Sequence, residues 1–118
     1  MKVLVVEDSK AVRHQVLRAL RQLGVSDSDL VVAENGSDAL ARLTDIDPDV
    51  ILSDWAMPEM GGVDLLRELR ARRSGVRFCL MSEGMPTRHM HEKAQTEGAD
   101  SLLSYPLSAD ALRDALDL

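Results

Sequence analysis

Three acidic residues follow two short apolar runs, and their types and positions suit them to chemistry. Glu7 and Asp8 come directly after residues 3–6, and Asp54 comes directly after residues 50–53. Open α/β sheets bind their ligands at the carboxyl ends of the strands, so acids at these points can share one site. Mg²⁺ takes one or two carboxylates and completes its shell with water and phosphate oxygens. We therefore expect Glu7, Asp8 and Asp54 to meet around a divalent cation.

A carboxylate beside such a cation can attack phosphorus and form an acyl phosphate. The protein then has to position the phosphoryl group and neutralise its equatorial oxygens. Ser82 ends a further apolar run, where its hydroxyl can donate to one of these oxygens. Taken singly, each acid fits a structural role better, with Glu7 and Asp8 as helix caps and Asp54 as a solvated loop acid. Ser82 alone fits an ordinary serine at a strand end equally well. Three acids at strand ends of one pattern favour the metal site, with Asp54 as the nucleophile.

Other reactive side chains fit structural positions better. Cys79 lies in the middle of an apolar run, which favours a core residue over a thiol nucleophile. His89 and His91 are two residues apart on an expected helix, so they point in different directions and make a poor metal pair. The chain has no glycine-rich phosphate loop, no Ser/His/Asp order and no paired cysteines for zinc.

Five expected strands alternate with five amphipathic segments, and these elements must position the acids. The strands are residues 3–6, 30–33, 50–53, 76–82 and 99–104, and the first of them is continuously apolar and rich in valine. Continuous apolar runs indicate strands buried on both faces, as in parallel sheets. Strands that alternate with helices at this spacing require right-handed crossovers. The pattern predicts an α/β fold with a parallel sheet that is covered by helices on both faces.

Glycine, proline and serine mark the expected helix ends. Gly24 ends the first helix and Gly98 the fourth. Ser37 is expected to cap the second helix, which stops at residues 47–48, and Ser108 to cap the last. Two further expectations are Pro86 in the first turn of the fourth helix and an inward stripe on the last helix, formed by Ala111, Leu112, Ala115 and Leu116.

Composition narrows the class of protein. A length of 118 residues fits one domain, and 45% hydrophobic with only 3% aromatic residues predicts an aliphatic core. The formal charge of -6 argues against nucleic-acid and anionic-membrane binding and suits a basic partner surface. A single cysteine excludes an internal disulfide. No run has the length of a membrane span or the pattern of a signal peptide, so we expect a cytoplasmic protein.

Along its whole length the chain resembles the receiver domain of two-component response regulators, of the stand-alone chemotaxis-regulator kind. The matching pieces are VLVVEDS at 3–9, AENGSDAL at 33–40, DVILSDWAMPEMGG at 49–62, LMS at 80–82, GAD at 98–100 and the proline at 106. The resemblance implies a flavodoxin-like (βα)5 three-layer sandwich with strand order 2-1-3-4-5. It also implies one receiver domain over residues 1–118, without an output domain.

The resemblance further implies an activity. A histidine kinase or phosphotransfer protein would donate a phosphoryl group from phosphohistidine to Asp54, and the hydroxyl of Ser82 would bind the transferred group. The implied Mg²⁺ ligands are Glu7, Asp8, Asp54 and the backbone carbonyl of Ala56. Phosphorylation would then change the face formed by the fourth helix, fifth strand and fifth helix, which a downstream protein recognises. Such a domain catalyses its own phosphorylation and dephosphorylation and is not a turnover enzyme.

Three positions depart from the family pattern. Tyr105 occupies the position of a lysine, and a phenol donates one hydrogen bond but carries no charge. Leu102 occupies a position that is usually aromatic. Glu83 occupies a position that is usually small, and it places a negative charge beside the phosphate if it points inward. The segment before Tyr105 is slightly longer than in typical members, which can turn Glu83 away. Lys10 and Arg88 are candidates to replace the missing charge.

These departures leave two alternatives to a phosphorylated receiver. One is an atypical receiver that binds its protein partner without phosphorylation, and partner affinity with and without a phosphoryl mimic separates the two. The other is a phosphatase with Asp54 as nucleophile, which multiple turnover of a phosphate ester would reveal. A phosphatase of this kind needs a second acid two residues further on. That position is Ala56, so we rank this alternative last.

Overall fold

Strands and helices alternate along the chain, and the computed structural model describes all of residues 1–118. The elements are β1 Val3–Val6, α1 Lys10–Gln22, η1 Asp27–Asp29, β2 Leu30–Ala33, α2 Gly36–Arg42, β3 Val50–Asp54, α3 Gly62–Ala71, β4 Arg77–Glu83, α4 Arg88–Glu97, β5 Ser101–Tyr105 and α5 Ala109–Leu116. The element η1 is a short 3-10 helix. The predicted alternation of strand and helix is confirmed.

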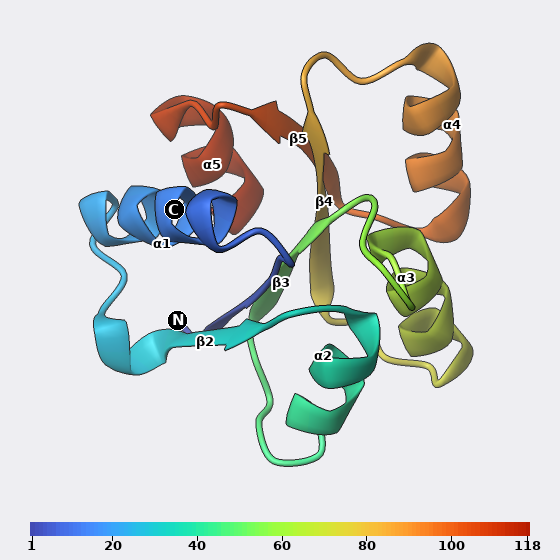
Figure 1. Cartoon of the computed structure of the whole chain (residues 1–118), viewed down its shortest axis with the longest axis horizontal. Coiled ribbons are helices and arrows are strands. Elements are labelled where there is room, and N and C mark those ends of the chain that lie inside the picture. The colour runs from blue at the N-terminus through green and yellow to red at the C-terminus, as the bar shows by residue number, and fades with distance from the viewer.

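All five strands are parallel and form one sheet in the order β2-β1-β3-β4-β5. Helices α1 and α5 cover one face of this sheet, and α2, α3 and α4 cover the other (Figure 1). Parallel strands need a crossover between them, and the helices supply it. The fold is therefore the expected flavodoxin-like three-layer sandwich with strand order 2-1-3-4-5.

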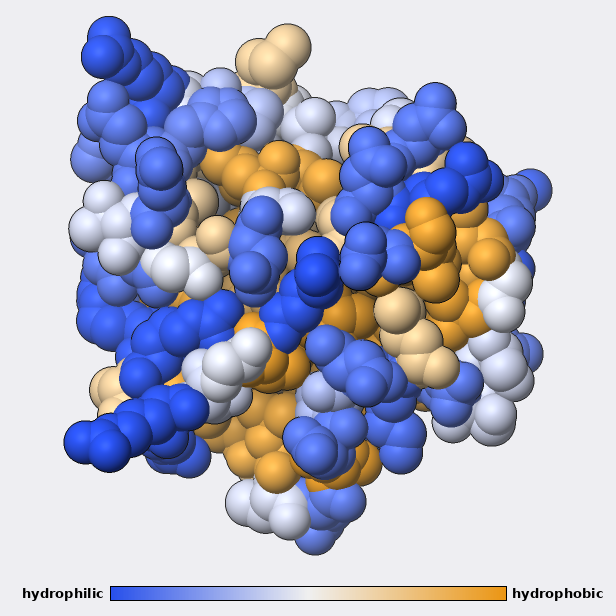
Figure 2. Space-filling view, turned by 180° about the vertical axis from the view of Figure 1, so that it is seen from behind, coloured by the Kyte–Doolittle hydropathy of each residue, from blue (hydrophilic) through white to orange (hydrophobic).

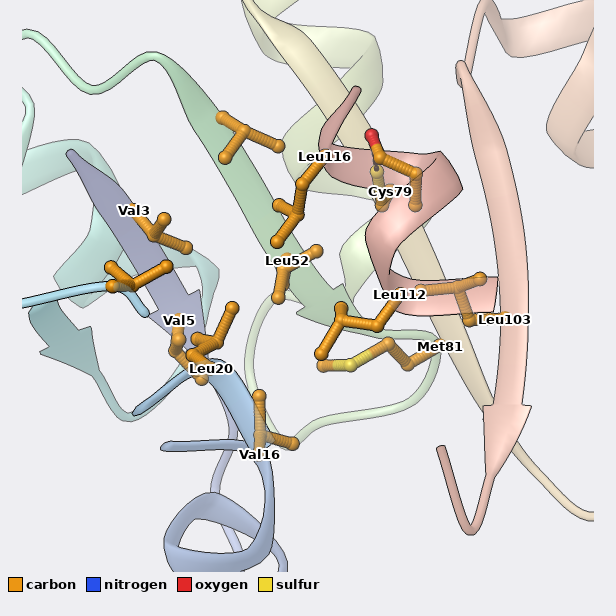
Figure 3. Close-up of a cluster of buried hydrophobic side chains, with 13 residues drawn as sticks. Val3, Val5, Val16, Leu20, Leu52, Cys79, Met81, Leu103, Leu112 and Leu116 are labelled. Carbon is orange, nitrogen blue, oxygen red and sulfur yellow. Dashed lines mark hydrogen bonds between the residues drawn. The ribbon is translucent and has the colours of Figure 1, made fainter. Parts of the chain in front are cut away.

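Two aliphatic cores hold the layers together. A cluster of 13 buried residues lies between the sheet and helices α1 and α5 (Figure 3). A second cluster of 11 buried residues lies between the sheet and helices α2, α3 and α4. All four residues of β1 are fully buried, because their side chains point alternately into the two cores. Cys79 lies in the first cluster with a free thiol, as its place in an apolar run predicted.

Several helix ends follow from local chemistry. Gly24 has a φ of +95° and Gly98 a φ of +89°, so both adopt the left-handed conformation that glycine tolerates after a helix. The Ser108 hydroxyl accepts a hydrogen bond from the Ala111 N–H at 3.0 Å and caps α5. These three predicted ends are confirmed.

Helix α2 differs from its prediction at both ends. The cap is Asn35 and not Ser37, because the Asn35 side chain accepts a hydrogen bond from the Asp38 N–H at 2.9 Å. Ser37 thereby lies inside the first helical turn. The helix ends at Arg42, before residues 47–48, because the chain leaves it in a turn directly afterwards. Proline excludes a helix beyond itself but does not make the helix reach it.

Two further expectations for helices are wrong. Pro86 precedes α4, whose cap is Thr87 with a side chain that accepts the Met90 N–H at 3.1 Å. Ala111 is exposed and does not belong to the inward stripe of α5. The buried positions of α5 begin at Leu112, and their spacing leaves Ala111 outside the inward arc.

On the face shown in Figure 2, hydrophobic side chains are visible in several areas, with hydrophilic side chains between them. The large exposed apolar side chains are Met1, Met85 and Leu118, and Met85 is 89% exposed. The described helices are all too short or too polar to cross a lipid bilayer.

Candidate functional site

The carboxyl ends of β1, β3, β4 and β5 border a cavity of about 590 Å³. Ten residues line it: Glu7, Asp8, Ser9, Val12, Gln15, Asp54, Ala56, Glu83, Tyr105 and Pro106. Side chains alternate across a strand, so a residue two positions beyond a core residue points to the same face. Asp54 follows Leu52 at this spacing, and Glu83 follows Met81. Both acids therefore point to the α1 side of the sheet edge.

Glu7, Asp8 and Asp54 come together as the sequence predicted. One carboxylate oxygen from each of them lies within 4.8 Å of the others. Glu7 is only 2% exposed, Asp54 is partly buried and Asp8 is exposed, so the group extends from the interior to the surface. Like charges at this separation repel one another strongly where water is excluded.

The pKa values of Glu7 and Asp54 reflect burial and this repulsion. Burial is the main cause that raises the pKa of the Glu7 carboxyl from 4.5 to about 8, and the charge of Asp54 is the second. The pKa of Asp54 is also raised, chiefly by burial, and the charges of Asp8 and Glu83 add to this effect. In the metal-free protein at neutral pH, the Glu7 carboxyl therefore holds a proton.

One oxygen of this group has no partner in the protein. Glu7 Oε1 accepts the Ser9 N–H at 3.3 Å, but Glu7 Oε2 is buried and has no hydrogen-bond partner. A buried and unpaired carboxylate oxygen is costly unless a proton or a cation satisfies it. Three clustered carboxylates with one orphaned oxygen fit a hard divalent cation. Ala56 also lines the cavity, and its carbonyl as a metal ligand stays a prediction.

The backbone around Asp54 is held by tight local packing. The Trp55 N–H donates to the Met81 carbonyl at 2.8 Å and extends the pairing of β3 with β4. The Gly62 N–H donates to the Trp55 carbonyl at 3.1 Å and folds the next loop back onto the strand. A Cβ at Gly62 would collide with the Asp54 carbonyl oxygen. Only glycine allows this close return of the chain, which fixes the direction of Asp54.

Ser82 lies in a different place from the other candidates. Its hydroxyl donates to the Gly84 carbonyl at 2.9 Å, and its side chain does not line the cavity. Ser82 is 2% exposed and points to the opposite face from Met81 and Glu83. Its expected contact with a phosphoryl oxygen requires the hydroxyl to leave Gly84, and this role stays a prediction.

Tyr105 lines the cavity with a neutral side chain. Its hydroxyl donates to the Met81 Sδ at 3.3 Å, and sulfur is a weak acceptor. Burial raises the pKa of this phenol, and the charges of Glu7, Asp54 and Asp8 raise it further. The phenol is therefore a hydrogen-bond donor throughout the physiological range of pH.

Glu83 faces the cavity, so its side chain points inward, the orientation that the sequence left open. It pairs in register with Tyr105 at the ends of β4 and β5. The longer segment between these strands does not turn it away. Neither Lys10 nor Arg88 lines the cavity, and Arg88 is paired with Glu92 at 3.0 Å.

The sequence prediction missed the contribution of α1. Val12 and Gln15 line the cavity, and their spacing of three residues places them on one side of the helix. The Arg13 guanidinium donates to the Glu7 backbone carbonyl at 2.9 Å. Ser9 caps the helix by accepting the Val12 N–H at 3.3 Å. In the sequence, the capping residue Ser9 directly after the two acids indicated that a helix begins beside the site.

The remaining reactive side chains stay apart from the cavity. His89 and His91 are exposed on α4, and His14 is exposed on α1. The buried Cys79 thiol contacts the Ala115 carbonyl at 3.8 Å, and burial raises the pKa of the thiol to about 11. It therefore remains a protonated core residue at neutral pH.

Comparisons with known proteins agree with this geometry. A family model described as the response regulator receiver domain matches residues 3–117. The chemotaxis protein CheY-3 of Vibrio cholerae is 33% identical over 118 residues, which cover 99% of this chain and 89% of that protein. The chemotaxis protein CheY of Listeria monocytogenes is 29% identical over 118 residues, with 99% and 96% covered.

Solved structures show the same likeness. The receiver domain of the Francisella response regulator 1452 superposes with a TM-score of 0.84 at 30% identity, and 98% of this chain and 93% of that one are covered. The chemotaxis response regulator CheY4 of Vibrio cholerae gives a TM-score of 0.82 at 26% identity, with 98% and 95% covered. The match therefore extends over sequence and fold alike.

Proposed function

The chain belongs to the response regulator receiver domain family, and on that premise we propose that Asp54 accepts a phosphoryl group from a histidine kinase or phosphotransfer protein. The observation that carries this proposal is the acid cluster with its orphaned oxygen, Glu7 Oε2. Phosphoryl transfer to a carboxylate requires a cation beside the phosphoryl oxygens, and the acid cluster next to Asp54 can bind one.

The transfer is a substitution at phosphorus. A carboxylate oxygen of Asp54 forms the new O–P bond while the P–N bond of phosphohistidine breaks. The imidazole nitrogen keeps the electron pair of the broken bond and leaves as the neutral ring once it is protonated. The fixed backbone at Trp55 and Gly62 holds the Asp54 carboxylate at the mouth of the cavity, so little reorganisation is needed.

The metal ligands would be Glu7, Asp8, Asp54 and the backbone carbonyl of Ala56. Mg²⁺ at this position supplies positive charge to the phosphoryl oxygens and permits the clustered carboxylates to ionise together. Glu7 must then release the proton that it holds in the metal-free protein. Tyr105 contributes a neutral donor at the cavity wall, and Ser82 contributes one only if its hydroxyl leaves Gly84.

The proposed output is a protein contact on the face of α4, β5 and α5. Only Ala94 of α4 is buried, so this helix is held by few apolar contacts and can shift at small cost. The phosphorylated protein would bind a downstream protein there, in the cytoplasm, without direct contact with nucleic acid or membrane. The charge of -6 supports a basic partner.

The first test is phosphorylation of the intact chain by acetyl phosphate with Mg²⁺, measured by intact-protein mass. Asp54→Asn should reduce uptake to background, because the amide is a poor nucleophile. Asp45→Asn is a matched control, since Asp45 is exposed in the turn after α2. Equal uptake by Asp54→Asn and the parent protein would reject Asp54 as the acceptor.

A second candidate function has its own observation. Glu83 faces the cavity and no cationic side chain lines it, which favours a receiver that binds its partner without phosphorylation. Partner affinity that is unchanged by Mg²⁺ with beryllofluoride, a phosphoryl mimic, would support this candidate. A strong rise in affinity would reject it. Turnover of phosphate esters is not expected, because Ala56 offers no general acid.

A further inference from the structure

The cavity that surrounds Asp54 contains four acids and no base. Glu7, Asp8, Asp54 and Glu83 line it, and lysine, arginine and histidine are absent from its lining. Arg13 of α1 directs its guanidinium to the Glu7 backbone carbonyl and not into the cavity. The chain therefore brings no positive side chain of its own to the wall of this cavity.

The order of the strands places the negative charges on two sides of Asp54. Strand β3 lies between β1 and β4, so Glu7 and Asp8 lie on one side of Asp54 and Glu83 lies on the other. A cation held by the three-acid cluster is therefore on the β1 side. A phosphoryl group on Asp54 would face Glu83 on its β4 side without a positive charge between them.

Charge accounting shows the size of the imbalance. A phosphoryl group adds a charge of about -2 at neutral pH. With one divalent cation present, the ionised acids and the phosphoryl group leave roughly three uncompensated negative charges. Transfer of the group needs positive charge on its equatorial oxygens. With Mg²⁺ alone the chain therefore holds the phosphoryl group weakly, and a second cation on the β4 side would strengthen its binding.

We propose that an arginine side chain of the partner protein enters the cavity between Glu83 and the phosphoryl group and completes the site. This inference rests on the proposed phosphorylation of Asp54. A guanidinium is planar and offers several donors, so it can bind the Glu83 carboxylate and a phosphoryl oxygen together. Glu83 then serves to orient the incoming arginine and is the positioning residue for it.

The surroundings of Glu83 are open to such a partner. Glu83 is exposed, and a second hollow of about 250 Å³ continues from Tyr105 and Pro106 along α1. Met85, two residues beyond Glu83, is 89% exposed and offers an apolar contact that a free cation would not use. The charge of -6 further favours a basic protein surface over a neutral one.

The test is chemical rescue of phosphoryl-mimic binding. Beryllofluoride is titrated into the Mg²⁺-loaded protein and followed by fluorescence of Trp55, the single tryptophan and the neighbour of Asp54. Methylguanidinium chloride is compared with sodium chloride at equal ionic strength. We expect methylguanidinium to raise the affinity of the parent protein by about tenfold, a typical effect of one charge-assisted hydrogen bond.

Three variants make the result specific. Glu83→Gln should bind beryllofluoride more tightly in sodium chloride and lose most of the methylguanidinium effect. Tyr105→Lys puts a cation into the cavity wall and should bind tightly in sodium chloride without further rescue. Glu34→Gln, at an exposed site near β2, should behave as the parent protein. An equal rescue of Glu83→Gln and the parent would overturn the role of Glu83.

Failure of this inference differs from failure of the proposed function. Equal affinity in both salts, with Tyr105→Lys no better than the parent, would show that the cavity needs no added cation and would overturn the inference alone. Absence of Mg²⁺-dependent beryllofluoride binding in every variant, together with absence of phosphate on Asp54, would reject the proposed function and the inference with it.

Discussion

Glu7 carries its carboxyl into a part of the protein where only 2% of the residue is exposed. Burial opposes ionisation, and the neighbouring Asp54 opposes it further, so the pKa of Glu7 rises to about 8. At neutral pH the metal-free protein therefore keeps a proton on Glu7. The same residue that weakens the metal-free fold becomes a ligand once a divalent cation is present.

Glu7→Gln should stabilise the metal-free protein in a way that depends on pH. Glu7 ionises near pH 4.5 in the unfolded chain and near pH 8 in the folded one, so the folded state holds more protons between these values. Stability is therefore lost as the pH rises from 4.5 to 8, and glutamine removes this loss. Urea unfolding in EDTA should show a gain on the order of 2 kcal/mol above pH 8.

The low-pH end of the comparison between Glu7→Gln and the parent protein serves as a control. Near pH 4 the parent and Glu7→Gln should differ little, because the glutamate is protonated in both states. Glu34→Gln, at an exposed position, should match the parent at every pH. A gain that is the same at all pH values would show that packing, and not the titration of Glu7, causes it.

At the scale of elements, Arg70 of α3 joins the loop that follows its own helix to the end of α4. Its guanidinium donates to the Ser74 carbonyl at 2.8 Å, to the Val76 carbonyl at 2.9 Å and to the Gly98 carbonyl at 3.0 Å. Ser74 and Val76 lie in the loop between α3 and β4, and Gly98 follows α4. Arg67 of α3 also pairs with Glu97 at 3.0 Å, so polar contacts from α3 hold the C-terminal end of α4, a helix that buries only Ala94.

Arg70→Lys should destabilise the protein by about 1–3 kcal/mol, because an ammonium cannot reach all three carbonyls and leaves partly buried acceptors unpaired. Urea unfolding measures this loss. Arg72→Lys is the matched control, since Arg72 makes one exposed pair with Glu68 at 3.0 Å and should cost less than about 0.5 kcal/mol. Equal losses for both variants would mean that the Arg70 contacts contribute no more than a surface ion pair.

At the scale of the whole molecule, the sheet edge concentrates charge at one place. The chain carries a formal charge of -6, and four of its acids line one cavity at the carboxyl ends of the strands. Folding brings these acids together although sequence separates them by up to 76 positions, from Glu7 to Glu83. The resulting field attracts cations and basic surfaces and repels the free phosphate anion.

Mg²⁺ should therefore raise the stability of the whole fold. A ligand that binds only the folded state adds about 2.7 kcal/mol at one hundred times its dissociation constant. The gain should be larger at pH 8 than at pH 6, because bound metal requires the ionised form of Glu7. Thermal unfolding with and without Mg²⁺ measures the effect, and Asp54→Asn should reduce it.

A matched titration with Glu34→Gln shows whether general charge is responsible. That variant removes the same charge at an exposed position and should keep the full Mg²⁺ effect. An equal Mg²⁺ effect in Asp54→Asn and Glu34→Gln would mean that the cation binds the acidic surface without a specific site.

The sequence by itself determined the elements and the chemistry of their ends. The inner strands β1 and β3 could be predicted from apolar runs, because a strand buried on both faces needs apolar residues at nearly every position. The clustering of Glu7, Asp8 and Asp54 could be predicted, because parallel strands align their carboxyl ends at one edge of the sheet. Helix caps such as Ser108 could also be predicted, because a cap depends only on residues within one helical turn of it.

Only the tertiary structure decided which side chains enter the cavity. Ser82 and Glu83 are adjacent, and the register of β4 against β3 and β5 sends Ser82 away and Glu83 toward Asp54. Register is set by long-range pairing, and a shift of one residue exchanges the two faces. The end of α2 at Arg42 was likewise undetermined, because no local breaker lies there. Local sequence specifies elements, whereas the orientation of residues at their ends depends on contacts between distant strands.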